Sequence, residues 1–173
     1  GFPRAVVINA AWGLGENVVK GSVNPDEYMV HKKLLKEGGY KPIIEKKAGS
    51  KEKKMVFAKG GSKKTKNVDT SRKEQISFVL SDEEILKLAE WATIIEETYG
   101  KPMDIEWARD GKTGELFILQ ARPETVQSRK SASDLKSYKL REKGKKLLAG
   151  VAIGQAISAG KASLVESPDK GGH

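Results

Sequence analysis

Apolar and polar positions along the chain follow two distinct periods, and the shorter period is the more common. Short runs rich in β-branched and aromatic residues, separated by glycine and lysine, are typical of strands. These runs predict strands at residues 5–11, 26–32, 42–48, 53–59, 103–108 and 115–122. Residues 60–76 are polar, and we expect them to form a surface excursion with little regular structure.

One segment has the longer, helical period and predicts a helix at residues 82–99. Ser81 can cap its first turn, and Glu84 three residues later completes a capping box. Gly100 and Pro102 are typical of a helix end. The apolar side chains that recur at helical spacing form one stripe: Ile85, Leu88, Trp91, Ala92, Ile95 and Tyr99.

The composition changes after residue 127. Residues 128–147 are rich in serine and lysine and indicate a linker, whereas residues 148–173 contain small residues, glycines and alternating Val and Ile. This last segment predicts the beginning of a second, β-rich domain that is too short to bury a core. Because the first strand also begins with no polar leading segment, we expect a fragment at both ends.

Cysteine is absent from the 173 residues, which excludes a disulfide scaffold, a thiolate metal site and a cysteine nucleophile. The sequence contains no run of about 20 apolar residues, and its start does not resemble a signal peptide. We therefore expect a cytoplasmic location and no membrane partner.

The formal net charge is +9, which raises the possibility of a nucleic-acid partner. The lysines, however, are interspersed with Glu and Asp, which favours a solvated lysine-rich surface. A nucleic-acid binder would also need aromatic side chains on its basic face, and Trp12, Trp91 and Trp107 occupy expected core or motif positions. We expect no nucleic-acid partner, and a basic nucleic-acid-binding module is the alternative from another functional class.

The last two predicted strands carry polar side chains where a buried strand would carry apolar ones. Asp104 and Glu106 share one face of their strand, and Gln120 and Arg122 share one face of theirs. A register that pairs Glu106 with Gln120 also pairs Asp104 with Arg122, and brings all four groups to one face. Ile105, Trp107, Leu119 and Ala121 would then occupy the other face.

The turn between these strands could instead be a tight one at Asp110–Gly111. That register would place the two carboxylates beside Phe117 and Glu115, where charge is buried or repelled. Because a slip of one residue moves a whole strand face, we predict the wider loop.

The pattern alone leaves two interpretations of the four polar groups open. A carboxylate and an amide oxygen suit Mg²⁺, which commonly binds through one or two protein groups plus phosphates. An arginine nearby can hold phosphate oxygens in a fork and stabilise charge during phosphoryl transfer. The other interpretation is a partly buried salt bridge and an amide at a sheet edge.

The glycine-containing segment 11–21, "AWGLGENVVKG", is a second candidate for phosphate binding. It lacks the spacing of a dinucleotide fingerprint and the G-K-[ST] of a P-loop, so a plain tight turn fits equally well. His31, which is isolated in a predicted strand, is interpreted as structural rather than catalytic.

Three long segments resemble the phosphoenolpyruvate synthase (pyruvate, water dikinase) family: "NAAWGLGENVVKGSVNPDEYMVHK" (9–32), "LSDEEILKLAEWATIIEETYGKPMDIEWARDG" (80–111) and "LFILQARPETVQSR" (116–129). The resemblance implies an α+β fold for residues 1–127, the C-terminal part of an ATP-grasp domain, with a mostly antiparallel sheet and one long helix at 82–99. A weaker resemblance at 148–166 implies that residues 148–173 begin a phosphohistidine swivelling domain, after a linker.

This resemblance also implies a chemistry and a set of site residues. Members of the family convert ATP, pyruvate and water to AMP, phosphoenolpyruvate and phosphate through a phosphohistidine. Glu106 and Gln120 match positions that hold Mg²⁺, and Arg122 matches a catalytic position at the transferring phosphates of ATP. Asp104 matches a supporting position, and Glu16 is a further nucleotide-site candidate.

Several parts of the family's machinery are not in the sequence. The N-terminal ATP-grasp half, the catalytic histidine of the phosphohistidine domain and the pyruvate barrel are expected partners from the remainder of a parent chain, and His173 does not match the histidine motif. We predict no dikinase activity for the chain alone. The alternatives within this class are pyruvate phosphate dikinase and the related antibiotic- or glucan-phosphorylating dikinases.

Overall fold

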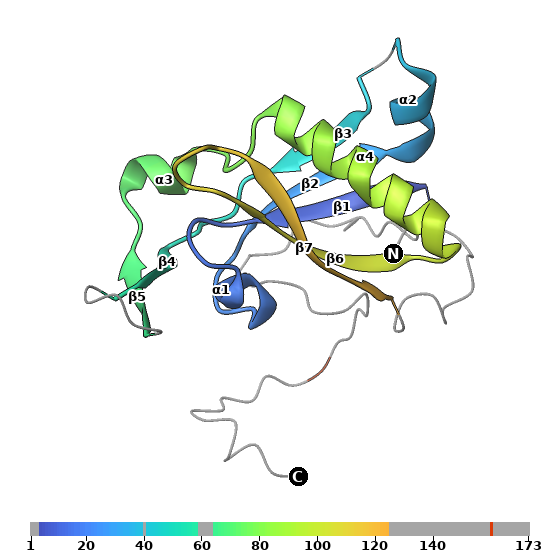
Figure 1. The fold of residues 1–173 in the computed structure, drawn as a ribbon. Helices are drawn as coiled ribbons and strands as arrows, with labels where there is room; N and C mark the ends of the chain where they lie inside the picture. Colours follow the sequence, from blue (N-terminus) through green and yellow to red (C-terminus); the bar gives the residue numbers. More distant parts are fainter. Residues whose placement is uncertain (1–3, 40, 59–63, 125–159, 161–173) are drawn as a thin grey trace. The chain divides into compact units, whose positions relative to one another are not determined.

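The computed structural model describes residues 4–39, 41–58, 64–124 and 160 (Figure 1). The chain divides into two units, Gly1–Tyr138 and Lys139–His173, and the helices and strands described below all lie in the first. The predicted linker at 128–147 lies outside the described residues, as does the predicted β-rich segment at 148–173 apart from residue 160.

The described part of this unit contains three antiparallel sheets, one long helix and three short helices, so the expected mixed α+β class with antiparallel sheets is confirmed. The sheets have the strand orders β1-β2-β3, β4-β5 and β6-β7. The elements in chain order are β1 (Ala5–Ala10), α1 (Glu16–Val19), β2 (Asp26–His31), α2 (Lys32–Glu37), β3 (Ile43–Lys47), β4 (Lys53–Phe57), β5 (Thr65–Asp69), α3 (Arg72–Ile76), α4 (Asp82–Tyr99), β6 (Met103–Arg109) and β7 (Leu116–Pro123).

Helix α4 has the bounds that the sequence predicts. The Ser81 hydroxyl accepts a hydrogen bond from the Glu84 N–H, and the Glu84 carboxylate accepts one from the Ser81 N–H at 2.8 Å. Gly100 ends the helix in the left-handed conformation. The predicted apolar stripe is correct in the first half of the helix and wrong at its end, where Tyr99 is exposed.

The core of the unit lies between α4 and the β1-β2-β3 sheet, across which α4 runs in Figure 1. Tyr28 and Val30 of β2 and Ile85 of α4 are fully buried there. Leu116 of β7 belongs to the same buried cluster, and Trp107 of β6 packs against it. The β6-β7 hairpin is therefore held by the core at the end where its loop lies. Among the helices that the structure describes, none has the length and apolar composition needed to cross a membrane.

A fully buried carboxylate, Asp26 at the start of β2, joins three segments of the chain. Its Oδ1 accepts hydrogen bonds from the Lys51 ammonium and from the Gly49 N–H at 2.9 Å. Its Oδ2 accepts from the Val79 N–H at 2.8 Å and from the Tyr28 hydroxyl at 3.1 Å. Burial raises the pKa of the Tyr28 phenol, which keeps it a neutral donor. Every lone-pair direction of the carboxylate is thus used, as a buried charge requires.

The prediction of little regular structure at residues 60–76 was wrong for residues 64–76, the part of this range that the structure describes. Residues 65–69 form β5, which pairs with β4, and residues 72–76 form α3. β5 buries none of its side chains, so it shows no apolar alternation. α3 begins with the same capping box as α4, formed by Ser71 and Glu74. That local signal was in the sequence and was missed.

Candidate functional site

The β6-β7 hairpin has the register that the sequence predicts at its outer end. Glu106 pairs with Gln120, and Asp104 pairs with Arg122. All four side chains are exposed, and because paired residues of an antiparallel ladder share a face, all four lie on the same face of the hairpin. The structure therefore brings together the four polar groups that were predicted to meet.

A bulge follows directly after the Glu106–Gln120 pair. Trp107 pairs with Ile118, so Leu119 is an extra residue on β7. The prediction that Trp107 and Leu119 would share a face was therefore wrong. Leu116, which is buried, and Ile118, which is half-buried, lie on the core side, whereas Leu119 is exposed. The bulge lets β7 point apolar side chains inward near the loop and polar ones outward beyond it.

The loop of the hairpin is the wider one that was predicted. The Asp110 carboxylate accepts hydrogen bonds from the N–H groups of Lys112 and Thr113 at 2.7 and 2.8 Å. These bonds lower the pKa of Asp110, so the carboxylate that organises the loop stays charged. The Asp110 N–H bonds to the carbonyl of Glu115 at 2.8 Å and closes the loop.

The ion pair on the exposed face is loose. The Arg122 Nε lies 3.7 Å from the Asp104 Oδ2, and the two side chains are 65% and 51% exposed. Such an exposed pair contributes at most about 1 kcal/mol to stability. The guanidinium consequently retains donors that can reach a ligand, and the alternative of a partly buried salt bridge does not describe this pair.

The oxygen donors of Glu106 and Gln120 suit a Mg²⁺ ion that takes its other ligands from phosphate and water. They suit a metal enclosed by protein side chains alone less well. Among the described residues, no three His, Cys, Asp or Glu side chains come close enough to enclose a metal. Mg²⁺ commonly takes only one or two protein oxygens and completes its shell with phosphate and water. A carboxylate paired with an amide on an open face is a donor set of that kind.

Glu16, the remaining candidate, is positioned by a different element. It opens the short helix α1, and its carboxylate pairs with Lys20 one turn later at 2.5 Å. The pair is exposed, with Glu16 at 46%. The described contacts thus place Glu16 on the glycine segment and not on the face formed by the hairpin.

The glycine segment packs closely on β4. Gly13 has a φ of +80°, and a Cβ at this position would lie 2.4 Å from the carbonyl oxygen of Met55. The Leu14 N–H bonds to that same oxygen at 2.9 Å. Gly13 is therefore required for the approach of two backbones within the protein, which the sequence left open as a turn or a phosphate contact.

Contacts that the sequence did not predict fix the same segment. The Trp12 indole N–H bonds to the Glu74 carbonyl at 2.9 Å, and the buried Asn17 amide donates to the Asn67 Oδ1 at 2.8 Å. Both contacts join residues at least 50 positions apart. His31 caps α2 by accepting from the Leu34 N–H at 3.3 Å, in line with its structural interpretation.

Comparison with known proteins bears directly on this arrangement. Residues 1–143 match the family described as "Pyruvate phosphate dikinase, AMP/ATP-binding domain". The chain is 56% identical over 173 residues to a phosphoenolpyruvate synthase of Synechocystis sp., 48% over 176 residues to one of Aquifex aeolicus and 46% over 167 residues to one of Escherichia coli.

These alignments cover 96%, 95% and 95% of the chain but only 21%, 20% and 21% of the respective relatives. The chain thus spans about a fifth of the length of the curated relatives it matches. The resemblance on which the sequence interpretation rested is confirmed: the chain is homologous to part of phosphoenolpyruvate synthase and belongs to the pyruvate phosphate dikinase AMP/ATP-binding domain family.

Proposed function

We propose that the chain provides the C-terminal part of the Mg-ATP site of a phosphoenolpyruvate synthase. The single observation that carries this proposal is the exposed face of the β6-β7 hairpin, where Glu106 lies opposite Gln120 and Asp104 opposite Arg122. Its support is twofold: the four groups have the chemistry of a metal-phosphate site, and the family is described as an AMP/ATP-binding domain.

Each of the four groups has a distinct proposed role. The Glu106 carboxylate and the Gln120 carbonyl oxygen would hold Mg²⁺, and Arg122 would bind the transferring phosphates of ATP through its forked N–H groups. Asp104 would orient the Arg122 guanidinium, which its carboxylate meets at 3.7 Å. When bound, Mg²⁺ would supply charge neutralisation at the phosphate oxygens. Glu16 on α1 is proposed as a further contact of the nucleotide.

The Asp104–Arg122 contact is consistent with such a role because it is long and exposed. A guanidinium held by a tight, buried, bidentate pair has few donors left for a ligand, whereas the ion pair of Arg122 with Asp104 involves its Nε at 3.7 Å. The two terminal nitrogens of Arg122 are the groups we propose to bind phosphate during transfer. Positive charge there stabilises negative charge that develops on the phosphoryl oxygens.

We further propose that the parent protein performs the complete reaction, in which ATP, pyruvate and water give AMP, phosphoenolpyruvate and phosphate. The chain covers about a fifth of the length of its relatives, so the rest of the ATP cleft, the phosphorylated histidine and the pyruvate site would come from the remainder of the parent. In this proposal residues 1–127 belong to the ATP-grasp domain, 128–147 to a linker and 148–173 to the swivelling domain. The chain alone would be inactive.

A dikinase that uses phosphate in place of water is the second candidate, because the matching family is described by the name pyruvate phosphate dikinase. The acceptor is not determined by the four hairpin residues. Measuring whether phosphate is a product or a required substrate of the parent protein separates the two. The nucleic-acid alternative has little support, since Trp107 packs against the core and Trp12 bonds within the chain.

The proposed site can be tested in the full-length parent protein with Arg122→Ala and the matched control Arg109→Ala. Both arginines lie on the β6-β7 hairpin, but Arg109 pairs with Glu84 at its far end. We expect Arg122→Ala to lower the rate of ATP-dependent histidine phosphorylation by about a thousandfold. Arg109→Ala should leave the rate within about twofold, because its contact is an exposed ion pair. Equal rates for Arg122→Ala and the unsubstituted protein, with the fold retained, would refute the assignment.

A further inference from the structure

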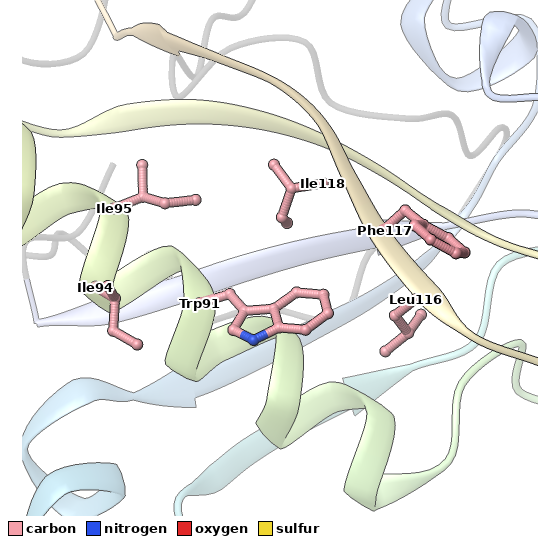
Figure 2. Close-up of a pocket in the computed structure, with 6 residues that line it drawn as sticks. All are labelled: Trp91, Ile94, Ile95, Leu116, Phe117 and Ile118. Atoms are coloured by element: carbon pink, nitrogen blue, oxygen red, sulfur yellow. The ribbon is translucent and has the colours of Figure 1, made fainter.

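An apolar groove runs between α4 and β7. It has a volume of about 350 Å³ and is lined by six apolar side chains: Trp91, Ile94 and Ile95 of α4, and Leu116, Phe117 and Ile118 of β7 (Figure 2). Ile94 is 58% exposed and Phe117 is 48% exposed. Neighbouring Leu119, the bulge residue, is also exposed.

The charge pattern of the chain makes this groove unusual. Charged residues are 32% of the sequence, yet within the part of the chain that the structure describes no charged side chain lines the groove. On the described part of the chain, α2 and α4 meet instead through ion pairs, between Lys32 and Glu96 and between Lys36 and Glu97. Contiguous apolar surface of this kind on a soluble domain marks a contact with another piece of polypeptide.

The strands beside the groove also lack partners on one side. β6 and β7 form a two-stranded sheet, so each is hydrogen-bonded along one edge only within the described residues. A two-stranded hairpin is marginal on its own, and free strand edges are usually covered or paired. The groove and the free edges thus both indicate that the hairpin is incomplete within the described residues.

We propose that an apolar segment of the same parent polypeptide, outside residues 1–173, fills this groove. The occupant is assigned to the parent chain because the relatives are about five times as long as the region they share with this chain. The inference rests on the proposed function only in taking the chain as part of a longer synthase. It adds a contact that the nucleotide site does not require.

Because the 173 residues contain no cysteine, a thiol introduced into this region can be assigned by the peptide that carries it. Single Ile94→Cys and Phe117→Cys variants of the full-length parent, with Lys66→Cys on exposed β5 as the control, would be labelled with a thiol reagent and quantified by peptide mass spectrometry. Circular dichroism would verify the fold of each variant. We expect the thiols at 94 and 117 to react at least about tenfold more slowly than the thiol at 66, because covered groups react only after local opening.

A photo-crosslinking residue at Phe117 then identifies the occupant. The expected product is a crosslink within one polypeptide, to a position outside residues 1–173. Rapid labelling at both 94 and 117 would overturn the proposal. So would a crosslink to a second copy, protection that depends on protein concentration, or a crosslink that maps within residues 1–173.

These results are independent of the proposed catalysis. Labelling is performed without nucleotide, while AMP formation is measured separately on the unsubstituted parent. Protection of the groove without AMP formation would reject the proposed function alone, and AMP formation with an open groove would reject this inference alone.

Discussion

Glu106 lies directly across the β6-β7 hairpin from Gln120, immediately beyond the bulge that Leu119 introduces. Counted from the loop, this is the first pair after the bulge, where the side chains change from core packing to the exposed face. A bulge increases local twist and re-aims the side chains that follow it. The pair is thereby anchored by Trp107 and Ile118 on its inner side and exposed to ligand on its outer side.

Loss of the Glu106 charge should weaken metal binding. Glu106→Gln in the full-length parent removes the only carboxylate of the proposed pair, and we expect the Mg²⁺ concentration needed for half-maximal nucleotide binding to rise by about tenfold or more. Glu115→Gln, which changes an exposed glutamate before β7, should leave it unchanged. A Mg²⁺ titration of nucleotide binding measures both. An unaltered titration for Glu106→Gln would remove this residue from the metal site.

Gly13 should not tolerate a side chain, whereas Gly15 should. Gly13→Ala places a Cβ against the Met55 carbonyl at a φ of +80°, and we expect it to reduce the free energy of unfolding by about 1–3 kcal/mol. Gly15 has a φ of −64°, and no atom lies within 4 Å of the position that an added Cβ would take, so Gly15→Ala should change stability by less than about 1 kcal/mol. Urea denaturation compares the two. Equal stability would contradict the close approach of the glycine segment to β4.

The Lys51 ammonium should be essential for stability because it neutralises a fully buried carboxylate. Lys51→Met removes the ammonium that pairs with the Asp26 carboxylate, and we expect a loss of about 3–5 kcal/mol of unfolding free energy. Lys66→Met, on the exposed strand β5, should stay within about 0.5 kcal/mol of the unsubstituted chain. Denaturant midpoints provide the measurement, and a mild effect of Lys51→Met would show that Asp26 finds another partner.

Glu74 should make stability depend on pH in the acid range. The Lys54 ammonium, and then the Ser71 N–H, lower the pKa of Glu74 from 4.5 to about 2. Because the folded pKa is the lower one, the stabilisation is complete above pH 4.5 and is lost as the pH falls toward 2. Thermal melts of Glu74→Gln should therefore show lower stability at pH 6, with the difference from the unsubstituted chain shrinking below pH 4.5. A difference that is constant across this range would contradict the shift.

Local signals explain which parts of the fold could be predicted. The bounds of α4 follow from Ser81, Glu84 and Gly100, all of which act within one turn of the helix ends. The pairing of Asp104 with Arg122 follows from alternation and from the cost of burying charge. Each of these predictions depends on residues close in sequence or joined by one short loop.

The features that were not predicted depend on contacts that the spacing of residues in the sequence does not reveal. Strict alternation cannot show that Leu119 is an extra residue, so the inner face of β7 was assigned incorrectly. β5 exposes its side chains, which removes the apolar signal, and only its pairing with β4 makes it a strand. Gly13 and Met55 are neighbours although they lie far apart in the chain, and no periodic pattern in the sequence indicates this contact.

Asp26 illustrates a further consequence of a satisfied buried charge. The Lys51, Gly49 and Val79 groups that bond to it come from loops on either side of the β4-β5 hairpin and α3, so those loops can be released only together. The segment between them is therefore tied at both ends to the first residue of β2. Release of this segment therefore requires that bonds to one buried carboxylate break at both of its ends.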